Sequence, residues 1–227
     1  MNRILPNQDR AVFASIALGA SLFIKLILKL IMFFKTRSIY EASTFEPEQE
    51  ALTNIVTLSA IFVIIYLALL IICATTFIMW FRRAYANLHR IGSTFLSYSE
   101  GWAAGAWFVP IGNLFLTYRI MNETWIETQD NLKPDSIHKE DNGLTLIGWW
   151  WGCWIFYNVV NYLLQAMSGL GYGTARLFSA ARMDLIGEII SIPACILAIL
   201  VIQRLNALEQ DMVDPAQTSD PIDHLIA

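Results

Sequence analysis

Three charged side chains lie inside long apolar runs of the sequence. Lys25 and Lys29 are one helical turn apart, and Glu188 falls in the last apolar run. A charge at bilayer depth costs about 2.5–3.5 kcal/mol on insertion scales, so each one requires an explanation. The plain interpretation is that both lysines extend along their helix until the ammonium groups reach the interface. An ion pair between Lys29 and Glu188, and a proton or ion relay, are the alternatives.

Side-chain amides gather on one side of another apolar run. Asn158, Asn161 and Gln165 are spaced at i, i+3 and i+7, which places them on one helical face. Amides in such positions typically form hydrogen bonds with a neighbouring helix, worth about 0.6 kcal/mol each. A polar cavity would use the same residues, and that alternative stays open.

The third apolar run is interrupted by proline and ends in polar residues. Arg119 and Glu123 are four positions apart and are expected to form a local salt bridge. Pro110 and Asn113 predict a helix break, with the Asn113 amide available to the carbonyls that proline leaves unpaired. A ligand-facing element is the alternative interpretation of the same residues.

A basic cluster follows the second apolar run and consists of Arg82, Arg83 and Arg90. Arginines at a membrane surface attract anionic lipid headgroups by about 1 kcal/mol per residue. A site for such headgroups is one interpretation of the cluster, and a surface for a protein partner is the other.

The sequence contains no recognisable catalytic, metal or cofactor motif. No serine lies in a nucleophile-elbow pattern, and no histidine has a second ligand three or four positions away. The cysteines are typical of small hydrophobic residues within apolar runs. No basic tract interleaved with aromatic residues indicates nucleic acid. The residues concerned are His89, His138, His224, Cys73, Cys153 and Cys195.

Five apolar segments must position these groups. The chain of 227 residues is 56% hydrophobic and 15% charged, with a mean hydropathy of +0.50, whereas soluble domains are about a quarter charged. Lipid offers no partner for an unpaired backbone amide, so the segments should be helices. We therefore predict an all-α integral membrane helical bundle over residues 1–208 and an acidic, flexible tail over residues 209–227. The segments are residues 11–34, 55–80, 102–121, 144–167 and 185–202.

The distribution of lysine and arginine leaves two topologies open. If all five segments cross, the basic residues divide almost evenly between the two sides. If the third segment enters and returns, or lies in the interface, they concentrate on the cytoplasmic side, as the positive-inside rule favours. The first segment is longer than the apolar core of a signal peptide, so we expect it to be retained.

The stretch from Trp80 to Trp125 resembles a bacterial membrane family of unknown function, the DUF4328 family. The resemblance rests on Trp80, Arg83 and Asn87, on the run GWAAGAWFVPIGNL over residues 101–114, and on YRIM over residues 118–121. Members of the family carry a second proline where this chain has Thr117. The resemblance implies a multi-span protein of the bacterial cytoplasmic membrane and brings no activity.

Three functions are compatible with these features. The first is a non-enzymatic membrane component, such as an accessory, scaffold or sensor subunit with a protein partner or a second copy of itself. The second is a small transporter or channel lined by the broken third segment and the amides of the fourth. The third is a lipid-modifying enzyme that uses Arg119 and Glu123 near the interface.

Overall fold

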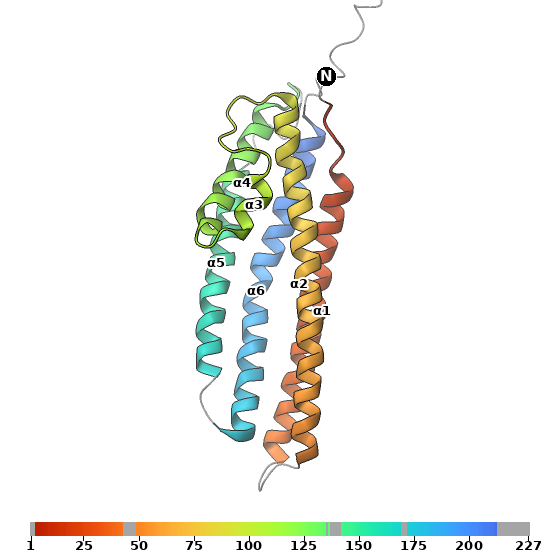
Figure 1. Cartoon of the computed structure of the whole chain (residues 1–227), viewed down its shortest axis with the longest axis vertical. Coiled ribbons are helices and arrows are strands. Elements are labelled where there is room, and N and C mark those ends of the chain that lie inside the picture. Colours follow the sequence, from red (N-terminus) through yellow and green to blue (C-terminus); the bar gives the residue numbers. More distant parts are fainter. Residues whose placement is uncertain (1–2, 43–48, 135, 137–141, 169–171, 213–227) are drawn as a thin grey trace, which may run out of the picture. The chain divides into compact units, whose positions relative to one another are not determined.

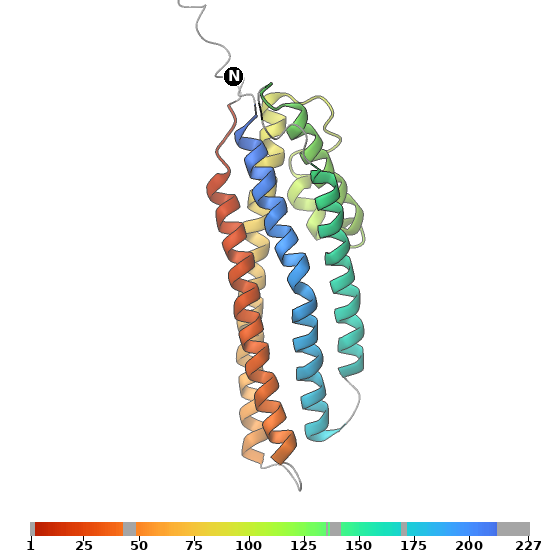
Figure 2. The same ribbon diagram turned by 180° about the vertical axis from the view of Figure 1, so that it is seen from behind.

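The computed structural model describes residues 3–42, 49–134, 136, 142–168 and 172–212, and these residues are almost entirely helical. The prediction of an all-α chain is therefore confirmed for the described residues. One isolated antiparallel bridge joins Leu132 to Met212. The elements are α1 (Gln8–Ala42), α2 (Gln49–Ile91), α3 (Trp102–Gly105), the 3-10 turn η1 (Ala106–Phe108), α4 (Gly112–Asp130), α5 (Gly143–Ser168) and α6 (Gly173–Gln210) (Figures 1 and 2).

Among the described residues, three helices are long and apolar enough to cross a membrane: α1, α2 and α6. The prediction of five such segments is wrong. The fourth segment forms the continuous helix α5, which is not among these three. The third segment is not one helix at all.

The third segment breaks at Pro110. The preceding residue, Val109, is extended, as the ring of a following proline favours. Ile111 then takes a positive φ of 63°, a strained value for a β-branched residue, before α4 begins at Gly112. The Asn113 Oδ1 atom accepts a hydrogen bond from the Thr117 hydroxyl (3.2 Å), and among the described residues Asn113 Nδ2 donates to no carbonyl. The predicted break is therefore present, whereas the predicted use of the amide is not.

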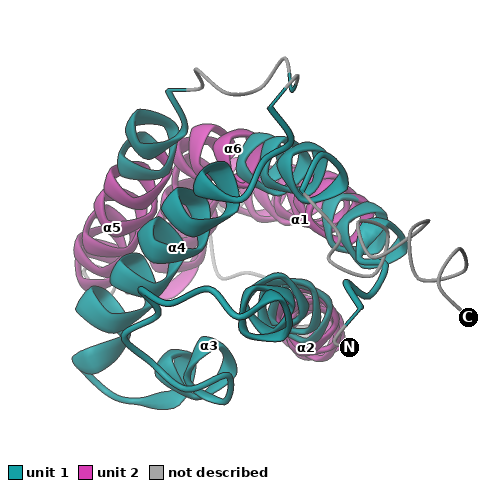
Figure 3. Cartoon of the chain, turned by 90° about the horizontal axis from the view of Figure 1, so that it is seen from above, with its two compact units in different colours: residues 1–15, 75–149, 199–227 teal, residues 16–74, 150–198 magenta. Residues whose placement is uncertain are grey.

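The described chain folds into two compact units, coloured separately in Figure 3. Unit 1 comprises residues 1–15, 75–149 and 199–227, and unit 2 comprises residues 16–74 and 150–198. The long helices contribute one part to each unit. Each unit has its own packing, and the two are described separately below.

Unit 1 has a core of large side chains from α2, α4, α5 and α6. On α2 the consecutive residues 84–88 are all buried, so this part of the helix is enclosed on every side. The Trp125 ring of α4 fills the space beside Gly143, the first residue of α5, where a β-carbon would lie 1.7 Å from the ring. The fully buried large residues of this core are Trp80, Phe81, Tyr85, Leu88, Ile120, Met121, Trp125, Ile147, Val201, Ile202, Leu205 and Leu208.

Unit 2 consists of four helical segments, from α1, α2, α5 and α6. The Cys73 thiol of α2 donates to the carbonyl of Ala17 in α1 (3.3 Å), and Phe178 of α6 stacks on Tyr40 of α1. The outer face of the α2 segment is strongly apolar, and a lipid bilayer is the environment that suits such a face. Its exposed residues include Ile61, Val63, Ile64, Leu67, Leu70 and Ile71.

The close approach of Gly143 to Trp125 gives the first testable prediction. In Gly143→Ala the new methyl group overlaps a buried ring, and we expect a loss of about 2 kcal/mol or more in stability. Gly105→Ala is the matched control, because its added β-carbon meets nothing within 4 Å. Thermal unfolding of the detergent-purified proteins measures both. Equal unfolding midpoints for the two variants would contradict the packing described here.

Candidate functional site

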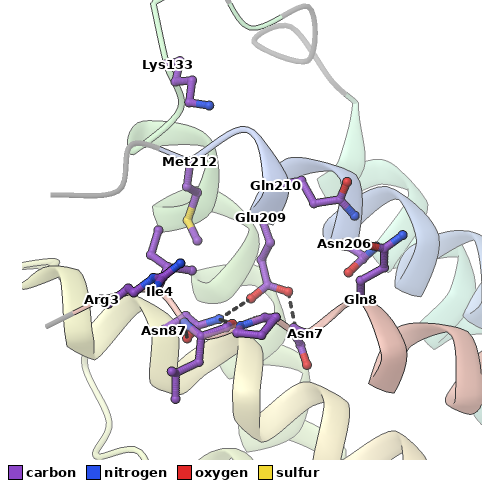
Figure 4. Close-up of a pocket in the computed structure, with 12 residues that line it drawn as sticks. Arg3, Ile4, Asn7, Gln8, Asn87, Lys133, Asn206, Glu209, Gln210 and Met212 are labelled. Carbon is purple, nitrogen blue, oxygen red and sulfur yellow. Dashed lines mark hydrogen bonds between the residues drawn. The ribbon is translucent and has the colours of Figure 1, made fainter. Parts of the chain in front are cut away.

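A buried carboxyl lies at the end of α6 in unit 1. Glu209 is 6% exposed and lies beyond residues 185–202, the predicted span of that helix. Its Oε2 accepts a hydrogen bond from Asn7 Nδ2 (2.7 Å), and its Oε1 accepts one from Asn87 Nδ2 (2.9 Å) (Figure 4). One carboxyl group therefore joins three segments that are far apart in the sequence.

Asn7 is held in place because it starts a helix. Its carbonyl accepts the first helical hydrogen bond of α1, from Ala11 (3.0 Å), which is the backbone arrangement of an N-cap. Its side chain does not cap the helix, since Nδ2 donates to Glu209 and to the carbonyl of Trp80 (3.2 Å). The Asn7 Oδ1 atom is buried without a hydrogen-bond partner. This site therefore contains one unused acceptor.

Asn87 binds the segment before α1 as another peptide group would. Its Oδ1 accepts from the Leu5 amide (3.0 Å), while its Nδ2 donates to the Leu5 carbonyl (2.9 Å). The same Nδ2 supplies the second proton to Glu209, so both of its N–H groups are used. Asn87 is fully buried on α2. Without the Asn87 amide, the Leu5 backbone and the Glu209 carboxyl would each lose a hydrogen-bond partner.

Burial raises the pKa of Glu209 to about 7. The hydrogen bonds from Asn7 and Asn87 and the charge of Arg83 act in the opposite direction, because they favour the ionised carboxylate. The loss of hydration outweighs them. The Glu209 carboxyl consequently changes its protonation state near neutral pH.

A pocket of about 330 Å³ opens beside Glu209, and unit 1 supplies all of its walls. Around the buried acid the lining carries two cations and several amides (Figure 4). The pocket wall at Lys133 is held in place by the residues that follow α6. The Lys133 amide donates a hydrogen bond to the Asp211 carbonyl (3.1 Å), and Met212 forms an isolated β-bridge with Leu132. The polar lining residues are Arg3, Asn7, Gln8, Asn87, Lys133, Asn206, Glu209 and Gln210.

Sequence analysis missed this pocket. Asn7 precedes the first apolar segment, and Glu209 was assigned to the flexible tail, whereas it lies in the last turn of α6. Residues 213–227 of that tail lie outside the described residues. Asn87 was noticed as part of the resemblance but was given no role. A carboxyl in the last turn of a long apolar helix, with an asparagine at another helix start, was the available signal.

Glu123 holds a loop and does not pair with Arg119, so the predicted local salt bridge is wrong. Its Oε1 accepts hydrogen bonds from the Tyr85 hydroxyl (2.6 Å) and from the Ser97 amide (2.7 Å). Burial, and then the hydrogen bond to Glu123, raise the pKa of Tyr85 above its ordinary value. The Tyr98 carbonyl also accepts from Tyr85. Together these bonds fasten the segment between α2 and α3.

Unit 2 contains two ion pairs between α1 and α6, one helical turn apart, which we call the charge ladder. Lys25 lies 3.0 Å from Glu188, and Lys29 lies 2.9 Å from Asp184. An ion pair was the alternative interpretation of these lysines, and the Lys29–Glu188 pairing given for it is wrong by one helical turn. The two lysines are four residues apart on α1, and the two acids are four apart on α6, so antiparallel helices align both pairs. Asp184 was overlooked because it lies one position before the predicted segment.

The three side-chain amides of α5 that were expected on one face have two kinds of neighbour, α6 or α5 itself. Gln165 donates to Asp184 and so joins the charge ladder, and the Asn161 side chain lies against Gly187 of α6. Asn158 donates to the carbonyl of Trp154 in its own helix (2.7 Å). The expected amide face is thus partly directed at α6, and one member turns back on α5.

The family comparison covers most of the chain. Residues 42–207 match the family described as a domain of unknown function (DUF4328). The chain belongs to the DUF4328 family. No curated protein and no solved structure matches it. In this DUF4328 chain the matched range contains Asn87 and the charge ladder acids, whereas Glu209 falls just after its end and Asn7 lies well before its start.

The charge ladder gives the second prediction. In Lys25→Glu a carboxylate replaces the ammonium beside Glu188, and loss of one partner of a buried pair costs about 3–5 kcal/mol. We expect Lys25→Glu and Glu188→Lys each to lower the yield of monodisperse protein in detergent severely. The double variant Lys25→Glu/Glu188→Lys restores the ion pair with its charges exchanged, and it should recover most of the lost yield.

Reversal of the exposed pair Arg37–Glu41 is the control, and it should change little because solvent screens it. Size-exclusion chromatography of all variants measures the outcome. A double variant no better than the worse single variant would show that the two side chains do not interact.

Proposed function

We propose that this DUF4328 protein is a non-enzymatic membrane component that senses a small polar ligand in the pocket beside Glu209. One observation carries the proposal: a buried carboxyl held by two amide donors lies beside a pocket of about 330 Å³, whose lining includes Asn7, Asn87 and Glu209. Ligand sites typically combine a preformed cavity with a few well-placed polar groups.

The chemistry of the site favours binding over catalysis. The hydrogen-bond partners of Glu209 are amides, which neither take up nor release protons near neutral pH. General acid–base catalysis needs a group that exchanges protons with the reacting atoms. Glu209 instead offers acceptor oxygens, so the ligand that suits this carboxyl brings N–H or O–H donors.

A route from binding to signalling follows from the position of Asn7. Asn7 starts α1 through its backbone carbonyl and binds Glu209 through its side chain, so a ligand that competes for Glu209 changes the setting in which α1 begins. A ligand shifts a conformational equilibrium only through different affinities for the two states, and this contact supplies such a difference. A protein partner or a second copy of the chain would then respond to the changed start of α1.

The membrane setting of this function is also a proposal. The break at Pro110 and the polar character of α4 support a third segment that enters and returns or lies in the interface. That topology places most basic residues on the cytoplasmic side. Membership of the DUF4328 family supports a bacterial cytoplasmic membrane.

A small transporter or channel is the second candidate function, and the charge ladder favours it. Ionisable residues inside apolar helices commonly mark a substrate or ion path. Each lysine of the ladder already has an acidic partner, however, and paired charges are equally suited to holding helices together. This candidate therefore ranks below the sensor. Nothing comparable favours the lipid-modifying enzyme, because Glu123 is engaged with Tyr85 and Ser97.

The third prediction tests ligand binding directly. Purified protein is screened by thermal unfolding against amino acids, polyamines, monosaccharides and nucleosides. A ligand at about one hundred times its dissociation constant should add about 2.7 kcal/mol of stability. In Asn206→Ala, which removes a lining amide, we expect affinity to fall about tenfold.

Gln203→Ala is the matched control, because Gln203 is exposed on α6 and does not line the pocket. It should retain the full thermal shift. A panel without any shift, or an equal shift in the Asn206 and Gln203 variants, would rule out this pocket as the sensor site.

A further inference from the structure

Four arginines of unit 1 come together where two apolar segments end. Arg10 is in the first turn of α1, immediately before residues 11–34, and its Nη1 donates to the Met79 carbonyl of α2 (3.2 Å). That bond brings Arg10 to the helical turn that precedes Arg82 and Arg83, beyond residues 55–80. Arg90 lies seven positions after Arg83, on the same face of α2. Sequence analysis predicted the three arginines of α2, and the fold adds Arg10.

The positive charge of this arginine cluster is poorly neutralised. Arg82 lies 3.4 Å from Glu100, whereas Arg83 and Arg90 form no ion pair within the described part of the chain. Burial, and then the charges of Arg10 and Arg90, lower the pKa of Arg83. Cations that crowd one another in this way are stabilised by a bound anion.

Apolar side chains lie next to the arginine cluster on the exposed surface. Val12 and Phe13 of α1 are 47% and 64% exposed, and Met79 of α2 is 48% exposed. A phospholipid has the complementary order of groups, with a phosphate above its acyl chains. Guanidinium groups bind phosphate through paired hydrogen bonds, and lipid phosphates lie at the level where apolar segments end.

We propose that Arg10, Arg82, Arg83 and Arg90 bind the phosphate of an anionic phospholipid whose acyl chains lie along Val12, Phe13 and Met79. A lipid is favoured over free phosphate because the exposed apolar residues adjoin the cations. Glu100 occupies one edge of the cluster, beside Arg82, so the headgroup contacts fall mainly on the other three arginines. None of these arginines lines the Glu209 pocket, although the charge of Arg83 acts on the Glu209 carboxyl.

Native mass spectrometry of the full chain tests the proposal. The protein is released from micelles that contain phosphatidylcholine and phosphatidylglycerol in equal amounts, and the retained lipids are counted. We expect the unsubstituted chain to retain phosphatidylglycerol preferentially. Arg90→Gln, an exposed and unpaired position, should reduce the preference about fivefold, and Arg10→Gln/Arg83→Gln should reduce it by more than tenfold.

Arg176→Gln is the matched control, since Arg176 is an exposed arginine of α6 outside the cluster, and it should keep the preference. Equal retention of both lipids by the unsubstituted chain would overturn the proposal. So would an equal loss in the Arg90 and Arg176 variants. Displacement of phosphatidylglycerol by millimolar inorganic phosphate alone would assign the site to the free anion and refute the lipid.

Discussion

Burying the Glu209 carboxyl removes its water, and side-chain amides from Asn7 and Asn87 take the place of that water. A buried polar group without partners loses several kcal/mol of hydration, so these bonds constrain where both asparagines lie. Asn7 then fixes the start of α1, and Asn87 fixes the backbone at Leu5. The ends of α6 and α2 and the first described residues of unit 1 therefore depend on one carboxyl group.

Unit 2 satisfies the same requirement with charges of opposite sign. Lys25 and Lys29 each have an acidic partner on α6, and the Lys29 ammonium also lies 4.8 Å above the Tyr66 ring. In an apolar setting such pairs specify which helical turn faces which, because a shift by one turn leaves a charge unpaired. The two units thus use different chemistry for their polar interiors, amides around an acid in one and ion pairs in the other.

The sequence predicted features that depend on local pattern and missed those that depend on distant partners. Long apolar runs predicted α1, α2 and α6, and Pro110 predicted the break before α4, because hydropathy and proline geometry act locally. The pair of Lys29 with Asp184 was missed, since register between helices is set by packing along their whole length. Glu209 was missed because an acidic residue near the end of a chain is typical of a solvated tail, and only the fold brings Asn7 to it.

The pH dependence of stability measures the burial of Glu209 most directly. Folding raises the pKa of Glu209 from 4.5 to about 7. At pH values between these two, the folded chain keeps a proton on Glu209 that the unfolded chain has released. The contribution of the neutral acid is complete below about pH 4.5 and is lost as the pH rises to about 7, a change of about 3 kcal/mol. The difference in unfolding midpoint between the unsubstituted chain and Glu209→Gln, which cannot titrate there, should follow that curve. A difference that is constant across this range would show that Glu209 is hydrated and contradict the account.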